Sequence, residues 1–282
     1  MKIGVSGASG KLGQKVLEYL AAGGGSHSVV GISRSPENIA PPIEGRRGDY
    51  DDAASLASAY EGLDRLLLIP SADLRPGVRG GQLRAAIDAA QSAGVEHIVL
   101  MSAAGTREAA ESTVGGAYWT GEQHLIKTAR HWTILRMNYY AESMAEEIQM
   151  SIGMNVLTGL GDERVAYVSR DDLAAAAAGA LVGDGHAGAI YNGTGPAVVT
   201  GPERAALVSQ IVGKPIGYAV ITEEQLRDGM AQAGMPELVV DVVAEIKRTF
   251  VLGYFDVVTS DTERLSGRSP KSLRDVLLPT LA

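Results

Sequence analysis

Three short segments are apolar at every position, and they constrain the fold more than any other feature of the sequence. They are VVGI (29–32), LLLI (66–69) and IVLM (98–101). A run of this length with no alternation of polar residues is typical of a strand covered on both faces. The three segments therefore predict a parallel sheet buried between layers of helices.

Helical patterns separate these segments, so strands and helices alternate along the chain. This alternation predicts an α/β domain with a doubly wound parallel sheet. A strand-like piece and a helix follow within 165–182, and a further strand at 189–195. We expect earlier strands at 2–7, 27–34, 64–71, 96–105 and 131–138, and helices at 14–22, 51–60, 82–93 and 121–129.

The pattern changes after about residue 195. The segments 200–213 and 222–234 have the pattern of amphipathic helices, and the segment 236–255 follows them. We therefore predict a Rossmann domain at 1–195 and a smaller, mostly helical lobe on the substrate side at 196–282, packed as one unit with a cleft between them.

Composition excludes several classes of protein. The chain of 282 residues has no cysteine, which excludes disulfides, thiolate catalysis and zinc–thiolate sites. A net charge of −8 argues against a nucleic-acid surface. The five histidines are scattered and no pair has zinc-ligand spacing, so no metal is expected. We see no secretory signal, and the apolar run at 173–182 is too short to span a bilayer. We expect a cytoplasmic protein, a monomer or homodimer, with a small-molecule substrate and no membrane or nucleic-acid partner.

The first predicted strand leads into GASGKLGQK, a glycine-rich turn that opens the first predicted helix. Gly7 permits the tight turn, Gly10 lets the backbone approach a pyrophosphate, and Gly13 lets the helix pack closely on the strand. The N–H groups of residues 9–12 would then face the phosphates at the positive end of the helix. The alternative is a strand–helix corner that binds no ligand.

The end of the second predicted strand indicates which dinucleotide is bound. NAD-binding proteins usually have an acidic residue there, which binds the ribose hydroxyls. This chain instead has Ser33, Arg34 and Ser35, and an arginine suits the 2′-phosphate of NADPH. Arg34 as a solvated surface residue is the alternative, and Arg46 and Arg47 are further candidates.

Ligands of such sheets bind beyond the carboxyl ends of the strands. Asp49 and Tyr50 follow a short third strand and are expected near the adenine, although Asp49 or Asp51 is equally suited to cap a helix. Ser71 and Ser102 end later strands and are candidates to border the nicotinamide, with turn formation as the alternative.

The catalytic pair of many short-chain dehydrogenases is missing. It consists of a tyrosine with a lysine four residues later, but Tyr118 is followed by Glu122 and Tyr140 by Met144. No G-x-S-x-G elbow or G-K-[ST] phosphate loop is present. The catalytic residues are therefore left unassigned.

The motifs GASGKLGQ, GISR, GDYDD, LLLIPS, AAQSAGVEHIVLMS, ILRMNYYAE and SRDDLAAAAA occur in the order and spacing of a known family. Together they resemble the NmrA-like atypical short-chain dehydrogenases, particularly the bacterial NADPH-dependent quinone reductases and triphenylmethane dye reductases. The resemblance implies that the glycine loop holds the pyrophosphate, Arg34 the 2′-phosphate, and later segments the adenine and nicotinamide. The cofactor-binding residues it implies are Gly7, Ser9, Gly10, Lys11, Leu12, Gly13, Arg34, Asp49, Tyr50, Ile69, Ser71, Ser102 and Tyr140.

Two departures from the family pattern concern the substrate pocket. Quinone reductases of this type have a histidine and a lysine where this chain has Tyr118 and Gln123, and an asparagine where it has Met137. Tyr118, Met137 and Tyr139 are the predicted pocket residues, with Tyr118 as a proton donor or an aromatic wall.

These features lead to an NADPH-dependent reductase as the expected function. The acceptor would be small, flat and electron-poor, such as a quinone, a dye, an enone, or a carbonyl or imine of a specialised pathway. The alternatives are a non-catalytic NADP(H)-binding redox sensor and a structural descendant that no longer binds nucleotide.

Overall fold

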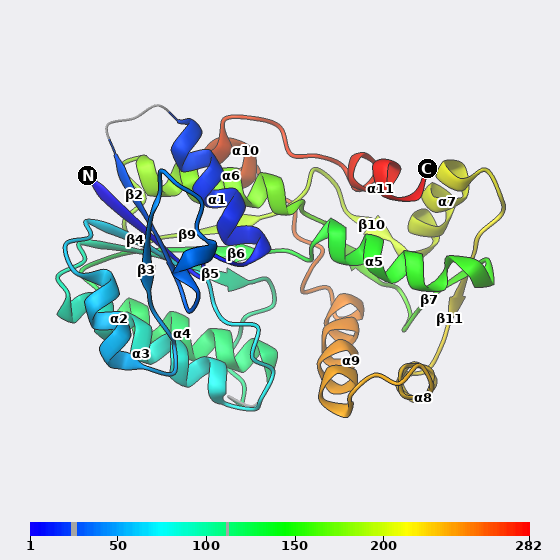
Figure 1. The fold of residues 1–282 in the computed structure, drawn as a ribbon. Coiled ribbons are helices and arrows are strands. Elements are labelled where there is room, and N and C mark those ends of the chain that lie inside the picture. The colour runs from blue at the N-terminus through cyan, green and yellow to red at the C-terminus, as the bar shows by residue number, and fades with distance from the viewer. Residues whose placement is uncertain (24–26, 111–112) are drawn as a thin grey trace.

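The computed structural model describes residues 1–23, 27–110 and 113–282, and the predicted parallel sheet is its centre. The described residues form a seven-stranded sheet in the order β3-β2-β1-β4-β5-β6-β9, in which each neighbouring pair is parallel (Figure 1). The order reverses at β1, and this reversal opens a crevice beyond the carboxyl ends of the strands. The strands are β1 (Lys2–Ser6), β2 (Ser28–Ser33), β3 (Glu44–Arg47), β4 (Arg65–Leu68), β5 (His97–Ala103), β6 (His131–Met137) and β9 (Ala189–Gly193).

Helices cover both faces of this sheet, and each face has its own apolar core. Leu67 lies in the core beneath α1 and α6, whereas its neighbours Leu66 and Leu68 lie in the core beneath α2, α3 and α4. Alternate residues of a strand point to opposite faces, so a strand apolar at every position supplies both cores. The doubly wound α/β fold is therefore confirmed. The helices are α1 (Lys11–Ala22), α6 (Arg170–Val182) and α10 (Asp261–Ser266) on one face, and α2 (Ala53–Tyr60), α3 (Val78–Ser92) and α4 (Val114–Thr128) on the other.

The remaining elements form a second lobe beside the sheet (Figure 1). Its apolar core includes Met144, Ile148, Val208, Phe250 and Leu277, which come from distant parts of the chain. Two small sheets complete it, an antiparallel pair β8–β10 and a parallel pair β7–β11. The elements are α5 (Ala141–Ser151), η2 (Ile152–Met154), β7 (Val156–Gly159), β8 (Arg164–Val165), β10 (Val199–Thr200), α7 (Gly201–Val212), β11 (Gly217–Val220), α8 (Glu223–Gln232), α9 (Glu237–Val251) and α11 (Leu273–Leu281); a further short helix, η1 (Pro36–Asn38), follows β2 in the sheet lobe.

The chain crosses between the two lobes more than once. α5 and β7 precede residue 195 but contribute to the core of the second lobe. α10 follows residue 195, yet its Leu265 packs in the core beneath α1 and α6. The domain boundary at residue 195 therefore stays a prediction. In the structure, each lobe contains segments from before and after that residue.

Three predicted helix starts are wrong. α1 begins at residue 11 instead of 14, α3 at 78 instead of 82, and α4 at 114 instead of 121. Each missed first turn contains glycines, which have a low helix propensity.

At the starts of α1 and α4, one glycine of each missed turn lies at a close contact, whereas Gly80 and Gly81 at the start of α3 do not. A Cβ on Gly13 would lie 2.3 Å from the carbonyl oxygen of Gly7, and one on Gly116 would lie 2.0 Å from that of Ala110. The absence of a side chain is required there for packing, and this requirement outweighs the low helix propensity of glycine.

Two further findings concern the residues that the structure describes. None of their helices combines the length and the apolar character needed to cross a membrane. Within the same residues, no three or more His, Asp or Glu side chains gather as a metal-binding group.

Candidate functional site

The glycine turn after β1 holds the start of α1 close to the sheet. Gly7 has a φ of +89°, which favours glycine, and its N–H donates to the carbonyl of Ile32 at 3.0 Å. Gly13 packs against this turn, and Leu12 is buried in the core beside it. The lack of a side chain at Gly13 and the buried side chain of Leu12 therefore serve packing.

The first turn of α1 is open. Gly10 is the N-cap residue, and no side chain in the described part of the chain caps this helix. Apart from its neighbours along the chain, a Cβ on Gly10 would meet only the carbonyl oxygen of Gly7 among the described atoms, at 3.4 Å, so the space beside Gly10 is open. Unpaired N–H groups at the positive end of a helix bind anions. This cradle fits the pyrophosphate of a dinucleotide.

Polar side chains surround this turn at the end of β2. Ser33 donates a hydrogen bond to Ser9 at 2.9 Å, which ties the end of β2 to the glycine turn. Arg34 is exposed, and it has no hydrogen bond or ion pair with the residues that the structure describes. Arg46 is engaged by Glu44 at 2.7 Å, and Arg47 by Asp52 at 3.4 Å. Among these three arginines, Arg34 has the guanidinium most available for a phosphate.

The segments after β3 and β4 meet beside this region. The hydroxyl of Tyr50 donates to the carbonyl of Ile69 at 2.7 Å, so these two predicted residues lie together. Asp52, and not Asp49 or Asp51, caps α2 by accepting from the N–H of Ser55.

Hydrogen bonds also link Asp51 and Ser71 through one side chain. Gln82 donates to Asp51 at 2.8 Å and accepts from the hydroxyl of Ser71. The hydroxyl of Ser71 is thus held at the end of β4, while Asp49 accepts from the N–H of Asp51 at 3.1 Å.

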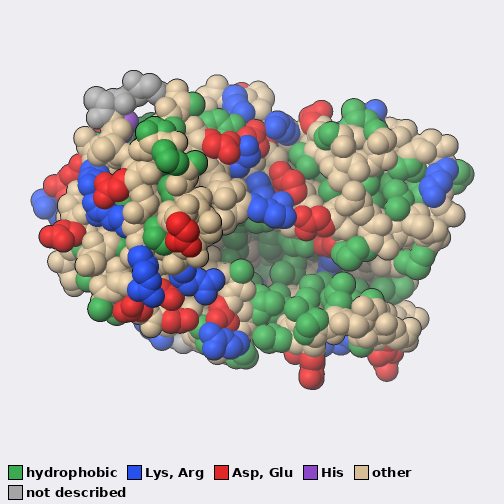
Figure 2. All heavy atoms as spheres, in the orientation of Figure 1, with side chains coloured by type: hydrophobic (Ala, Val, Ile, Leu, Met, Phe, Trp, Pro, Cys, Tyr) green, Lys and Arg blue, Asp and Glu red, His purple; other side chains and the backbone are tan. Residues whose placement is uncertain are grey.

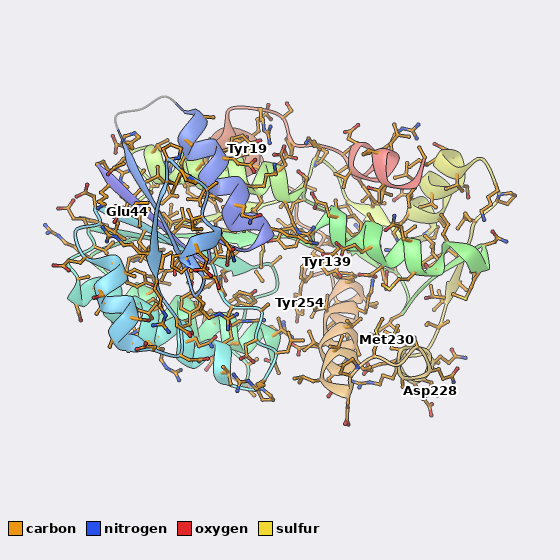
Figure 3. All side chains as sticks on the ribbon, in the orientation of Figure 1. Tyr19, Glu44, Tyr139, Asp228, Met230 and Tyr254 are labelled. Atoms are coloured by element: carbon orange, nitrogen blue, oxygen red, sulfur yellow. The ribbon has the colours of Figure 1, made fainter. Side chains whose placement is uncertain are left out.

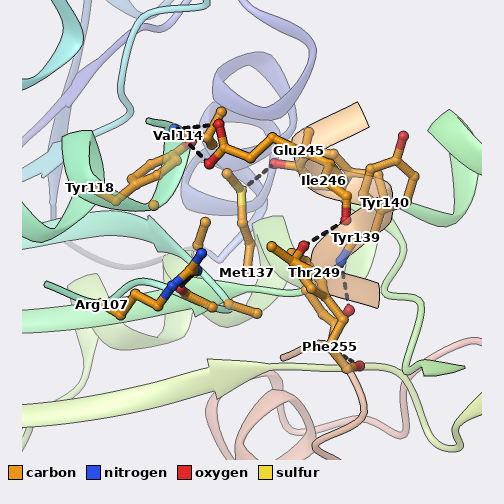
Figure 4. A pocket seen from close by; sticks show the side chains of 15 residues that line it. Arg107, Val114, Tyr118, Met137, Tyr139, Tyr140, Glu245, Ile246, Thr249 and Phe255 are labelled. Carbon is orange, nitrogen blue, oxygen red and sulfur yellow. Dashed lines mark hydrogen bonds between the residues drawn. The ribbon is translucent and has the colours of Figure 1, made fainter. Parts of the chain in front are cut away.

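A cavity of about 160 Å³ lies between the sheet lobe and α9 (Figure 4). All three predicted pocket residues, Tyr118, Met137 and Tyr139, line it, and Tyr140 does so as well. Figure 2 shows a hollow between the two lobes, with hydrophobic side chains gathered in it. The remaining lining residues are Ala103, Ala104, Gly105, Arg107, Val114, Gly115, Asn138, Glu245, Ile246, Thr249 and Phe255.

The three tyrosines of the cavity are held differently. Tyr140 donates to the sulfur of Met137 at 3.0 Å, and the guanidinium of Arg170 stacks on its ring at 4.8 Å. Burial raises the pKa of Tyr140. Tyr118 has the guanidinium of Arg79 over its ring at 5.2 Å; burial raises its pKa, and the charge of Arg79 offsets part of this effect. At neutral pH both phenols therefore keep their protons.

Tyr139 belongs to a network that sequence reasoning missed. Its hydroxyl donates to Glu147, and Lys247 of α9 donates to the other oxygen of that carboxylate at 2.6 Å. Burial and the charge of Glu147 raise the pKa of Tyr139 well above its ordinary value. The Tyr139 ring lies at the junction of the lobes (Figure 3), and its hydroxyl is engaged by a carboxylate outside the cavity lining.

Ser102 is not brought into this site. It is fully buried and donates to the buried carboxylate of Glu122 at 2.6 Å. The same carboxylate accepts from Arg136 at 2.9 and 2.6 Å. The hydroxyl of Ser102 therefore anchors α4 to the sheet, and it is absent from the cavity lining.

The second lobe contributes cavity residues that the sequence analysis did not identify. Glu245, Ile246 and Thr249 come from α9, and Phe255 follows that helix. The carboxylate of Glu245 accepts from the N–H of Val114 at 3.0 and 3.2 Å, so α9 contacts the start of α4. The amphipathic pattern of α9 predicted a helix, but nothing in it indicated which face lines a cavity.

Comparison with known proteins agrees with this geometry. The model of a family described as "NAD(P)H-binding" matches residues 7–183. The chain belongs to this family. The nicotinamide cofactor is thereby confirmed, and the matched segment contains the open turn of α1 and Arg34.

Similar proteins are oxidoreductases. Quinone oxidoreductase 2 of Escherichia coli (strain K12) is 32% identical over 250 residues, which cover 86% of each chain. The NAD(P)H azoreductase of Xenophilus azovorans is 28% identical over 96% of this chain and 95% of its own length. An NmrA-like family domain-containing oxidoreductase of Aspergillus flavus is 25% identical over 81% of this chain and 77% of its own length. The predicted resemblance and the class of NAD(P)H-dependent oxidoreductase are confirmed.

Two solved structures have nearly the same fold. The NADPH-dependent quinone oxidoreductase of Escherichia coli, complexed with NADPH, has a TM-score of 0.90 and 28% identity, and the alignment covers 98% of both chains. The triphenylmethane reductase of a Citrobacter species, complexed with NADP(H), has a TM-score of 0.90 and 26% identity, covering 99% of this chain and 100% of that one.

Proposed function

We propose that this protein is an NADPH-dependent reductase of small, flat, electron-poor acceptors, such as quinones, azo or triphenylmethane dyes, enones, and carbonyls or imines of a specialised pathway. One observation carries the proposal. The open start of α1 follows β1, and the aromatic cavity lies at the ends of β5 and β6, so both lie beyond the carboxyl ends of strands of the same parallel sheet. A dinucleotide bound at the first would extend toward the second.

The proposed binding residues follow the dinucleotide from one end to the other. Backbone N–H groups of residues 9 and 11–13 bind the pyrophosphate, and Arg34 binds the 2′-phosphate that distinguishes NADPH from NADH. Asp49 and Tyr50 border the adenine, and Ile69, Ser71 and Tyr140 border the nicotinamide half. The buried position of Ser102 argues for a supporting role behind this surface. When bound, NADPH supplies a hydride from its nicotinamide ring.

The cavity residues orient the acceptor and exclude water. Tyr140, Met137 and Tyr139 supply aromatic and apolar walls, which suit a flat ring system. Tyr118 retains its proton at neutral pH and lines the cavity, so its hydroxyl donates to an oxygen or nitrogen of the acceptor as that atom gains charge. The names of the similar proteins support the choice of quinone and dye acceptors.

The cavity makes a purely sensory role less favoured, because a sensor needs no walled space beside the nicotinamide. The proposal includes a cytoplasmic monomer or homodimer, with a dinucleotide domain at 1–195 and a substrate lobe at 196–282. Gel filtration with light scattering measures the oligomeric state.

The first experiment is a fluorescence titration with NADPH and with NADH, followed by consumption of the preferred cofactor with a panel of quinones, dyes, enones and ketones. We expect tighter binding of NADPH and turnover of at least one flat acceptor. Tight binding without turnover across the panel would favour the sensor, and no binding of either nucleotide would overturn the proposal.

The variant Tyr118→Phe tests the proton donor. It keeps the aromatic wall and removes the hydroxyl, so we expect kcat to fall while KM changes little. Because loss of a positioned acid typically costs about 100-fold or more, an unchanged kcat would assign Tyr118 to the wall alone. The Tm of this variant should match that of the wild type.

A further inference from the structure

One cation that lines the cavity has no acidic partner among the residues that the structure describes. Arg107 lies in the segment after β5 and lines the cavity, half-buried. In the described part of the chain, no carboxylate lies within ion-pairing distance of its guanidinium. One N–H donates to the carbonyl of Gly105 at 2.8 Å, and a guanidinium carries five N–H donors. Most of its hydrogen-bonding capacity is therefore available.

The position of this guanidinium is fixed from both lobes. It stacks on the ring of Tyr254, 4.6 Å from the ring centroid, and Tyr254 follows α9 in the second lobe. Gly105 has a φ of +76°, and a Cβ there would lie 3.1 Å from the Cβ of Tyr254, so the absence of a side chain permits this close packing. Figure 3 shows Tyr254 at the junction of the lobes.

Three other charged groups in or beside the cavity are engaged by partners. Glu245 lies across the cavity from Arg107 in Figure 4, and its carboxylate accepts from the N–H of Val114 at the positive end of α4. Lys247 pairs with Glu147 at 2.6 Å, and Arg136 pairs with Glu122 at 2.6 Å. Arg107 and Glu245 are thus the two charged residues of the lining, and of these Glu245 is engaged by the start of α4 while the guanidinium of Arg107 keeps most of its donors.

We propose that Arg107 makes this cavity selective for acceptors that carry an oxyanion group, a carboxylate or a sulfonate, at the edge of the flat ring. The proposal rests on the proposed reductase function and deepens it by naming the substrate class. The aromatic walls hold the ring, and the guanidinium binds the oxyanion through two parallel N–H donors. Arg107 is then a specificity-determining residue and takes no part in hydride transfer.

The experiment compares wild type with Arg107→Gln on 1,2-naphthoquinone, its 4-sulfonate and its 4-carboxylate. We expect the ratio of kcat/KM for each anionic quinone to that for the neutral quinone to fall about 10- to 100-fold in the variant, since one charge-assisted hydrogen-bond pair is lost. Arg107→Lys should restore part of the ratio. A fall with only one of the two anions would restrict the site to that oxyanion.

Arg264→Gln is the matched control. Arg264 also stacks on a tyrosine, at 5.1 Å from the ring of Tyr191, and it does not line the cavity. This variant should keep the wild-type ratio. An unchanged ratio in Arg107→Gln, or an equal fall in Arg264→Gln, would overturn the proposal.

A binding measurement separates this proposal from the reductase function. Calorimetry compares naphthalene-2-sulfonate with the neutral naphthalene-2-sulfonamide on the wild type and on Arg107→Gln, both saturated with NADP⁺. We expect the wild type to prefer the sulfonate and the variant to lose that preference. Such a loss without turnover of any quinone would uphold the anion site and overturn the reductase function. Equal binding of both compounds by the wild type would overturn the anion site even if quinones are reduced.

Discussion

The N-terminal ends of α1 and α4 both carry a partial positive charge, but only that of α4 is capped by side chains of the described residues. α1 begins after Gly10, and no side chain among the described residues caps it. α4 begins after Thr113, whose hydroxyl oxygen accepts from the N–H of Gly116 at 3.0 Å. The carboxylate of Glu245 also accepts from the N–H of Val114, from across the cleft. One positive helix end is left open for an anion, and the other is closed by an anion that the protein supplies.

The positive end of a helix thus has two different roles in this protein. At α1 the open N–H groups are available to a phosphate, which supports the cofactor site. At α4 the internal carboxylate joins the second lobe to the sheet lobe and becomes part of the cavity wall. A helix start therefore indicates a ligand site only when the surrounding fold leaves it uncapped.

The strongest test of the comparison replaces two glycines of the open turn separately. Gly10→Val adds a side chain to the space in front of α1, so NADPH affinity should fall by at least about 100-fold through loss of two or more charge-assisted hydrogen bonds. Its Tm should stay close to that of the wild type, because a Cβ there makes only one contact, at 3.4 Å. Calorimetric titration and thermal unfolding measure the two quantities.

Gly13→Val is the contrasting variant. Its Cβ would lie 2.3 Å from the carbonyl oxygen of Gly7, so α1 must move off the sheet. We expect the free energy of unfolding to fall by about 3 kcal/mol. If both variants lost stability equally, the open space in front of Gly10 would not be a binding site.

A smaller effect is expected at the end of β2. Arg34→Ala should weaken NADPH binding by about 1.5–3 kcal/mol, the contribution of a hydrogen bond to a charged group, and leave NADH nearly unchanged. Arg47→Ala is the control, since Arg47 is also exposed but lies 3.4 Å from Asp52. Equal weakening of both nucleotides by Arg34→Ala would show that Arg34 does not recognise the 2′-phosphate.

The smallest effect concerns the closed helix start. Glu245→Gln removes the charge that faces the positive end of α4, and the free energy of unfolding should fall by about 0.5–1 kcal/mol. KM for the acceptor should also change, because α9 lines the cavity. Thr113→Ala is matched to it: it removes the local cap of the same helix at a cost of about 1 kcal/mol. Urea unfolding and acceptor kinetics distinguish the variants, and an unchanged KM in Glu245→Gln would indicate that the contact between the lobes does not shape the pocket.

Local patterns predicted much of the cofactor half. The apolar runs predicted buried strands, and the glycine motif predicted a turn before α1, which the structure leaves without a side-chain cap among the residues it describes. Arg34 was singled out because no acidic residue ends β2, and in the structure it is exposed. These predictions depend on residues adjacent in sequence, for which short-range sterics and charge are sufficient.

The substrate half was less predictable. The start of α4 was wrong because the close contact of Gly116 with Ala110 cannot be read from the sequence. Ser102 was expected at the ligand surface, but its hydroxyl is turned to Glu122, a partner twenty residues away in the sequence. No local pattern indicated that Glu245 would close the start of α4.

The sequence by itself determined the alternation of strands and helices, the open turn at Gly10 and the cation at Arg34. Only the tertiary structure decided that Tyr118, Arg107 and the α9 residues share one cavity, and that Glu245 spans the cleft. The physical reason is range: backbone conformation follows from neighbours along the chain, whereas a cavity and its charge balance depend on side chains that folding brings together from distant segments.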